Sequence, residues 1–334
     1  MLNSWFADSG ELVQLVAAFK EGQLGDGTME KVERELSSQI GVPRFRVELS
    51  QGVVSLFLCT ENGEPLHVAA ANGYLQVLKL LIESRANINA RRKCDEMTPL
   101  SLACQHAEIE VAEYLLMSRA QIEEGATVHP ISPLFLAVWG GHHRIVELLL
   151  ESRANPNQAT INRGETPLYY AADFKHLECA RCLLDANAEV NRRILFNGET
   201  PVMAAAREGD VEIVKLLLDA RAYLNQSRTV DGETALSLAA FNGELDAVRF
   251  LVECRASINQ VNSNIGLTAV WAACEEGHLD VVKCLVESGG NIMTANGTTP
   301  RDAAAKNGHL DVVRFIEDRT GLGLPPNKRA RVEI

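Results

Sequence analysis

The sequence predicts a mainly α-helical fold, a solenoid of eight stacked helix-turn-helix units joined by hairpin connectors, with a small α+β segment before the first unit. Two observations support this fold class. One pattern of residues recurs at a nearly constant spacing, and each copy has the apolar spacing of two short helices. Because neither helix of a copy can bury its apolar side alone, neighbouring copies must stack to form a continuous core.

The repeated unit is clearest between Gly198 and Leu218. Thr200 is expected to begin a helix by accepting a hydrogen bond from a first-turn amide, and Pro201 suits the first helical position because an N–H would be unpaired there. Gly209 stands where a helix ends in a left-handed residue. The apolar residues after Gly209 then form one side of a second helix.

The copies share one register. Their starting positions are 34 residues apart six times and 31 residues apart once, at Glu64, Thr98, Ser132, Thr166, Thr200, Thr234, Thr268 and Thr299. The predicted helix pair has the same length in every unit, so only the connector after it changes. This is expected when packed helices fix the period and a protruding turn absorbs the difference.

Several starting motifs resemble a known family. The stretches Glu64–Ala69, Thr98–Ala103 and Thr166–Ala171 resemble the Thr-Pro-Leu-His-x-Ala signature of ankyrin repeats, and Gly277–Leu279 and Gly308–Leu310 resemble the Gly-His-Leu that follows it. The resemblance covers roughly residues 62 to 319, and the usual period of 33 is exceeded here by one residue. It implies a protein-binding array of helix pairs with finger-like hairpins.

The composition bounds the class of partner. Apolar residues make up 46% of the chain, the net charge is −12 and the isoelectric point is about 5.2. An acidic surface disfavours phosphate backbones and anionic membranes, so we expect a protein partner of unknown identity, no nucleic acid and no membrane. The sequence has no apolar run of membrane-spanning length and no secretory signal. We therefore expect a monomer that is cytoplasmic, nuclear or both.

A His-x-x-Cys-x-x-Cys run at His176, Cys179 and Cys182 offers a possible metal or redox site. The register argues against it. Cys179 and Cys182 occupy the positions that Ile213 and Leu216 hold in the next unit, which we assign to the core. Since free cysteine is among the most buried residue types, these thiols are interpreted as packing groups in a reducing compartment.

The sequence has no Gly-rich phosphate loop, nucleophile elbow or paired-carboxylate pattern. His142, His143 and Glu147 have the spacing of a metal-binding pair on a helix, but His142 occupies a turn position that histidine also holds in other units. We therefore expect no catalytic activity, no cofactor and no metal.

Residues 1–60 do not join the repeat register. A helix is expected at Thr28–Leu36, and strands are expected at Phe45–Leu49 and Val53–Leu58. This order resembles a truncated ubiquitin-like β-grasp domain; the alternative is a cap over the apolar edge of the array. The expected domains are a ubiquitin-like or capping segment at 1–60, an ankyrin-repeat array at 61–319 and a disordered C-terminal tail at 320–334.

The tail carries Lys328, Arg329 and Arg331 after two prolines. This pattern is typical of a short nuclear import signal, and the alternative is a merely soluble end.

Arginine replaces the usual glycine after the second helix in five units, at Arg85, Arg119, Arg153, Arg221 and Arg255. A left-handed arginine costs about 1 kcal/mol, so these units are either mildly strained or end the helix differently. Acidic residues stand two positions earlier in four units, at Glu83, Glu151, Asp219 and Glu253. This pattern favours a self-neutralising surface over an anion-binding row.

The resemblance implies that the two residues before the inter-helix turn face a concave groove. Large or charged side chains at these positions are the expected protein-binding residues: Trp139, Phe174, Arg207, Glu208, Phe241, Glu275 and Glu276. Aromatic residues are frequent hot spots and flanking charges select the partner, so we expect an apolar segment with basic residues near one end. Alternatively, the rings pack against hairpins such as Ile194–Phe196.

The sequence therefore predicts a non-catalytic protein-interaction scaffold. The alternative is an adaptor in a ubiquitin pathway that uses the N-terminal ubiquitin-like segment.

Overall fold

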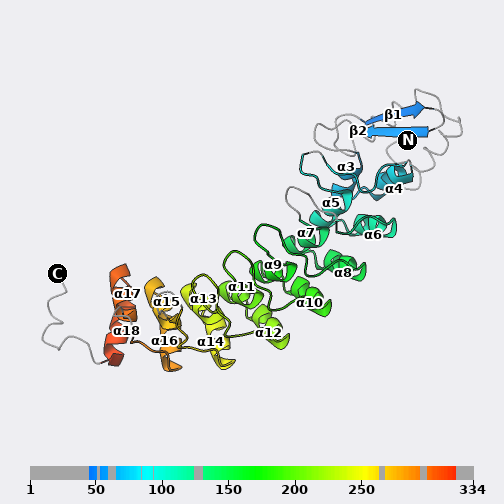
Figure 1. Ribbon diagram of the computed structural model, residues 1–334. Coiled ribbons are helices and arrows are strands. Elements are labelled where there is room, and N and C mark those ends of the chain that lie inside the picture. Colours follow the sequence, from blue (N-terminus) through cyan, green and yellow to red (C-terminus); the bar gives the residue numbers. More distant parts are fainter. Residues whose placement is uncertain are drawn as a thin grey trace, which may run out of the picture. The chain divides into compact units, whose positions relative to one another are not determined.

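The computed structural model describes residues 45–50, 53–58, 65–83, 85–92, 94–123, 131–262, 268–293 and 299–320. Helices dominate these residues and occur in consecutive pairs, which confirms the mainly helical, repeated fold class (Figure 1). The chain divides into two compact units, residues 1–161 and 162–334.

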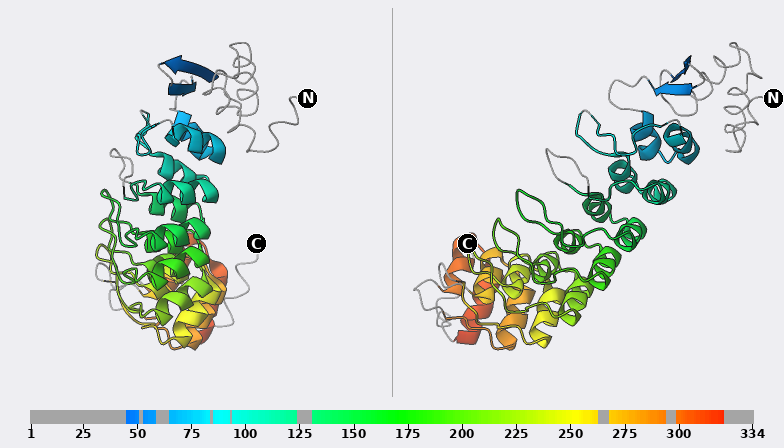
Figure 2. Two further views of the ribbon diagram at one scale, coloured as in Figure 1. Left: turned by 90° about the vertical axis from the view of Figure 1, so that its right-hand side faces the viewer. Right: turned by 45° about the vertical axis from the view of Figure 1, so that its right-hand side comes forward.

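The described part of the first unit is a two-stranded hairpin followed by three helix pairs. Strands β1 (Phe45–Ser50) and β2 (Val53–Leu58) are antiparallel, and β2 lies beside the first helix. The helices are α3 (Pro65–Ala71), α4 (Leu75–Glu83), α5 (Pro99–Gln105), α6 (Ile109–Met117), α7 (Pro133–Trp139) and α8 (His143–Glu151). The first helices of the pairs form one layer and the second helices form another (Figure 2).

The two strands coincide with the two strand candidates of the sequence. The helix expected at Thr28–Leu36 lies outside the described residues, as does the basic tail at Lys328–Arg331. No described residue therefore supports a complete N-terminal α+β segment or a ubiquitin-like domain.

The described part of the second unit contains five helix pairs. They are α9 (Pro167–Asp173), α10 (Leu177–Asp185), α11 (Pro201–Arg207), α12 (Val211–Asp219), α13 (Ala235–Phe241), α14 (Leu245–Glu253), α15 (Ala269–Glu276), α16 (Leu279–Glu287), α17 (Pro300–Asn307) and α18 (Leu310–Thr320). Odd-numbered inner helices pack on one another, as do even-numbered outer helices. Each helix pair therefore contacts chiefly its neighbours, as in a solenoid.

The core lies between the two helix layers. In the central pair, the alanines 204–206 of α11 and Leu217 of α12 are fully buried. Small side chains on the inner helices permit close approach, and large aliphatic side chains on the outer helices fill the remaining space. Leu216 and the equivalent Cys182 are only half-buried, so their assignment to the core was wrong, whereas that of Cys179 is confirmed.

Helix starts follow the predicted capping pattern with one exception. Hydroxyl oxygens accept a hydrogen bond from the third helical amide at Thr98, Ser132, Thr166, Thr234, Thr268 and Thr299. The prediction that Thr200 caps in this way was wrong. The amide of Met203 donates instead to the Thr200 carbonyl at 3.0 Å, which leaves the buried Thr200 hydroxyl without a partner among the described residues.

Polar side chains connect successive units. Asn191, Asn225 and Asn259 each accept a hydrogen bond from a backbone amide 32 residues later, over 2.7 to 2.8 Å. His278 and His309 donate from Nε2 to a carbonyl of the preceding unit, each at 3.0 Å. In the first compact unit, His142 likewise donates to the Gln105 carbonyl of the preceding repeat at 3.1 Å. The turn position of His142 therefore has a structural role.

The five arginines after the second helices are all left-handed, with φ between 65° and 71°. Their side chains are exposed. No ion pair among the described residues joins them to the acidic residues two positions earlier, so the expected self-neutralising surface stays a prediction that does not depend on direct pairing. Charge pairing occurs instead on the outer helices, as between Arg181 and Glu178 at 3.5 Å and between Lys283 and Asp280 at 3.0 Å.

Candidate protein-interaction surface

Three aromatic side chains lie half-exposed at the ends of inner helices. The exposed fractions are 49% for Trp139, 44% for Phe174 and 39% for Phe241. A left-handed residue follows each ring within two positions, at Gly141, Lys175 and Gly243, so the chain leaves the inner layer soon after the ring. Trp139 belongs to the first unit, whereas Phe174 and Phe241 belong to the second.

Phe174 rests on a preformed aromatic stack. Its ring centroid is 5.5 Å from that of Tyr170 and 6.2 Å from that of His176, and all three rings are nearly parallel. The Tyr170 hydroxyl donates to Glu165 at 3.2 Å. Burial, with the neighbouring Glu165 charge, raises the pKa of Tyr170 to about 12, so this donor remains protonated at neutral pH.

Arg207 is held by carboxylates. Its guanidinium contacts Asp173 on the preceding inner helix, Glu199 at 3.2 Å and Glu208 at 2.5 Å. Glu199 is 3% exposed and also accepts a hydrogen bond from the Tyr169 hydroxyl at 3.3 Å. Burial opposes the charge of Arg207, but Glu199 and Asp173 outweigh burial and raise its pKa. Arg207 therefore links α9 to α11 and remains charged.

The inner helix α15, which is two repeats after α11, ends with the carboxylates of Glu275 and Glu276. Glu275 is half-buried and Glu276 is exposed, and neither carboxylate has a hydrogen bond or ion pair among the described residues. Burial and then the Glu276 charge raise the pKa of Glu275, while Lys306 lowers it. The Glu275 carbonyl accepts hydrogen bonds from His309 and Asn307, so the backbone at this position is fixed.

The 34-residue spacing arranges these residues in two rows across the second unit. The first row contains Asp173, Arg207, Phe241 and Glu275, and the second contains Phe174, Glu208, Asn242 and Glu276. Adjacent members lie on adjacent inner helices, because α9, α11, α13 and α15 pack in that order. The structure therefore brings six of the seven predicted residues onto one side of the second unit, and Trp139 holds the corresponding register position in the first unit.

Sequence reasoning missed the partners of Arg207. Glu199 precedes Thr200 in a Gly-Glu-Thr motif, and such a motif looks like an exposed turn. The signal that was available is the register, which places Asp173 one unit before Arg207 at the same position.

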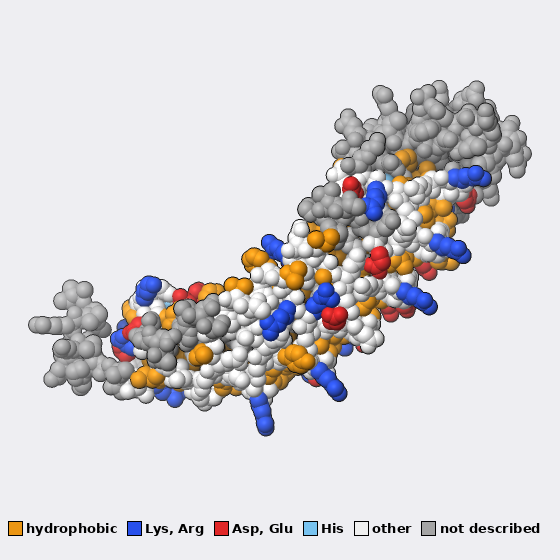
Figure 3. All heavy atoms as spheres, viewed as in Figure 1, with side chains coloured by type: hydrophobic (Ala, Val, Ile, Leu, Met, Phe, Trp, Pro, Cys, Tyr) orange, Lys and Arg blue, Asp and Glu red, His pale blue; other side chains and the backbone are white. Residues whose placement is uncertain are grey.

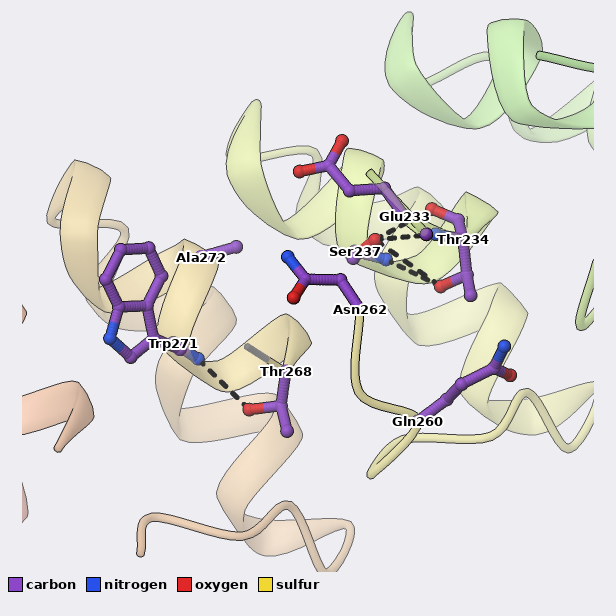
Figure 4. A pocket seen from close by; sticks show the side chains of 9 residues that line it. Glu233, Thr234, Ser237, Gln260, Asn262, Thr268, Trp271 and Ala272 are labelled. Carbon is purple, nitrogen blue, oxygen red and sulfur yellow. Dashed lines mark hydrogen bonds between the residues drawn. The ribbon is translucent and has the colours of Figure 1, made fainter. Parts of the chain in front are cut away.

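A small polar cavity lies between α13 and α15 (Figure 4). Its volume of about 20 Å³ has room for about one water molecule. The Thr234 and Ser237 side chains on its wall are hydrogen-bonded to each other's backbone amides. The indole nitrogen of Trp271 is buried without a partner among the described residues. The cavity is thus a packing feature, too small for an organic ligand.

The thiols of the His-x-x-Cys-x-x-Cys run do not assemble with His176. Cys179 is 1% exposed, and burial raises the pKa of its thiol to about 12. Over the described residues, no three His, Cys, Asp or Glu side chains are grouped as a metal ion would require. In that same part of the chain, no helix has the length and apolarity needed to cross a membrane.

Stacked helix pairs with left-handed turns and projecting connectors define a helical repeat protein. The family model of ankyrin repeats matches residues 47–125, 124–194, 188–262 and 256–322, which is more than half of the chain. The chain therefore belongs to the ankyrin-repeat family, whose repeats generally mediate protein–protein interaction. No curated protein matches the sequence significantly.

Proposed function

We propose that this protein is a non-catalytic scaffold whose second unit binds an apolar segment of a partner protein through the inner-helix surface. The observation that carries the proposal is the half-exposed ring of Phe241 beside Glu275 and Glu276, whose carboxylates have no hydrogen bond or close ion pair among the described residues, Lys306 acting on Glu275 only through its charge. His278 donates to the Phe241 carbonyl, and this hydrogen bond between adjoining repeats fixes the backbone at Phe241. A partner segment with Lys or Arg near the α15 end complements it.

The remaining predicted residues have different roles in this proposal. Phe174 is held in a stack with Tyr170 and His176 and is 44% exposed, so its accessible part is preorganised, which lowers the entropic cost of binding an apolar side chain. Glu208 adds negative charge. Arg207 is already bound by three carboxylates, so it positions its neighbours and does not attract an acidic partner. In the first unit, Trp139 provides a separate aromatic contact.

A site-specific crosslinking experiment tests this function. A photoreactive phenylalanine analogue replaces Phe241 in the full chain, and Leu310 provides the control position because it is 62% exposed on α18. We expect a crosslinked partner whose attached segment contains apolar residues and Lys or Arg. Calorimetry with that segment then compares the wild type with Phe241→Ser. A crosslink that is equally strong from both positions, or unchanged affinity, would refute the proposal.

A ubiquitin-pathway adaptor is the second candidate function. The β1–β2 hairpin motivates it, because the resembled β-grasp order has a strand at the position of β1, although no described residue supports the rest of that domain. Deleting residues 1–44 from the full chain should then abolish capture of ubiquitin-pathway proteins while partner binding by Phe241 persists. Capture that survives the deletion contradicts this role.

The proposal retains three domains, at residues 1–60, 61–319 and 320–334, and a monomer in the cytoplasm, the nucleus or both. A large cytosolic reporter fused to residues 320–334 tests the nuclear address. A reporter that stays uniformly cytoplasmic contradicts import by this tail.

A further inference from the structure

The connectors of the second unit expose more apolar surface than its inner helices. Leu195 and Phe196 are 74% and 71% exposed, and Val230 on the next connector is 57% exposed. Arg163 lies over the Phe196 ring, and Arg192 and Arg193 precede Leu195 on the same connector. We name this surface the fingertip patch, consisting of Leu195, Phe196, Val230, Arg163, Arg192 and Arg193. Figure 3 shows exposed hydrophobic side chains (orange) and basic side chains (blue) on the edge formed by the connectors.

Backbone contacts between connectors fix the patch. The Leu195 amide donates to the Arg163 carbonyl at 2.7 Å, and the Thr229 amide donates to the Asn197 carbonyl at 3.0 Å. Ile194 is 5% exposed and anchors the connector between α10 and α11 in the core. The left-handed Gly164 packs so closely that a Cβ there would lie 2.5 Å from Leu195 Cγ. The exposed apolar side chains are therefore presented on an ordered backbone.

The charge of the patch is opposite to that of the chain. Arg163 lies 5.7 Å from the Phe196 ring and 3.7 Å from Glu165, and Arg192 lies 3.3 Å from Glu189. The exposed fractions of the two guanidinium side chains are 65% and 40%. The Arg192–Glu189 pair is exposed on both sides and therefore weak, so a partner carboxylate can replace Glu189 at little cost. Glu165 is only 8% exposed, so Arg163 keeps that contact and offers the exposed part of its guanidinium to a partner. Arg193 is exposed as well.

We propose that the fingertip patch is a second docking surface, which binds an acidic apolar segment of a partner protein. Apolar side chains of the segment cover Leu195, Phe196 and Val230, and its Asp or Glu side chains pair with the arginines, whose planar guanidinium groups suit carboxylates. The net charge of −12 means that the rest of the chain repels an acidic segment, so the segment binds preferentially at the basic fingertip patch. The same net charge repels an anionic membrane.

Selection from a random peptide library tests the proposed chemistry directly. Phage-displayed peptides are selected on the immobilised full chain and then sorted by loss of binding to Phe196→Ser. We expect the peptides that depend on Phe196 to be enriched in Leu, Ile or Phe together with Asp or Glu. Enrichment in Lys or Arg, or the absence of any peptide that depends on Phe196, overturns the proposal. Peptides that depend on Phe241 report on the inner-helix surface, so the two surfaces are distinguished.

Affinity measurements with one selected peptide complete the test. Phe196→Ser and Arg193→Glu should each weaken binding about tenfold. Leu310→Ser is the control, since it removes an apolar side chain that is 62% exposed on α18, against 71% for Phe196, and its affinity should equal that of the wild type. Thermal unfolding verifies that each variant is folded. Equal losses in all three variants overturn the proposal, as does binding to phosphatidylserine vesicles that depends on Phe196 and exceeds binding to the peptide.

Discussion

The inner-helix surface and the fingertip patch of the second unit differ in both charge and exposure. The inner surface combines rings that are 39% and 44% exposed with carboxylates, whereas the fingertips combine side chains that are at least 57% exposed with arginines. Both surfaces are built on the same repeated helix pair, one at the ends of the inner helices and the other on the connectors. The difference shows that positions outside the helix-pair packing can vary freely, so one scaffold can display two chemistries.

The largest expected effect tests the core that both surfaces share. Leu217→Ala should lower the free energy of unfolding by about 2 to 5 kcal/mol, because its side chain is fully buried and its loss leaves a cavity. The half-buried Leu216 is the matched control, and Leu216→Ala should cost clearly less. Denaturant titration measures both. A larger loss for Leu216 would show that the outer helix is rotated from its described orientation.

Binding measurements should separate the two surfaces. Changing Trp139, Phe174 or Phe241 to serine should cost about 2 kcal/mol of binding to a basic apolar partner for at least one of the three rings, because aromatic side chains dominate interface energy. Phe196→Ser should leave that affinity unchanged. Calorimetry with the crosslinked segment measures each variant, and thermal unfolding should change little. Normal binding by all three ring variants would remove the inner-surface assignment.

Arg207 tests whether charge on the inner surface is structural. Arg207→Met leaves Asp173 and the buried Glu199 without their cation, so we expect stability to fall by about 1 to 3 kcal/mol. Removing the exposed Arg193 of the fingertip patch by the same substitution should cost less than about 0.5 kcal/mol. Denaturant unfolding measures both variants. Equal small losses would mean that the Arg207 cluster contributes nothing to the link between α9 and α11.

Sequence reasoning predicted the repeat well because packing imposes it locally. The Thr-Pro starts, the left-handed glycines and the apolar spacing all depend on residues within one unit. It failed where the outcome depends on a neighbouring unit or on the phase of a helix to within one residue. Examples are the unused Thr200 hydroxyl, the half-buried Leu216 and the ion pairs of Arg207. The exposure of Leu195 and Phe196 likewise depends on how successive connectors align.

The smallest expected effect concerns the acidic end of the inner surface. Burial and Glu276 raise the pKa of Glu275 in the folded protein, so the fold binds its proton more tightly than the unfolded chain does. Ionisation of Glu275 therefore destabilises the protein above its folded pKa, and this penalty disappears as the pH falls below the unfolded value of 4.5. Glu275→Gln should raise stability by about 0.5 kcal/mol at pH 7 and by nothing near pH 3.

Exposed Glu276 serves as the control, because its side chain is in contact with solvent and Glu276→Gln should therefore change stability less than Glu275→Gln. Unfolding of each variant between pH 3 and pH 7 measures the difference. If Glu275→Gln is instead destabilising at pH 7, the carboxylate is stabilised by the fold and is not held ready for a partner. The same substitution should weaken binding of a basic segment, since the group that costs stability in the free protein is the one that a partner cation neutralises.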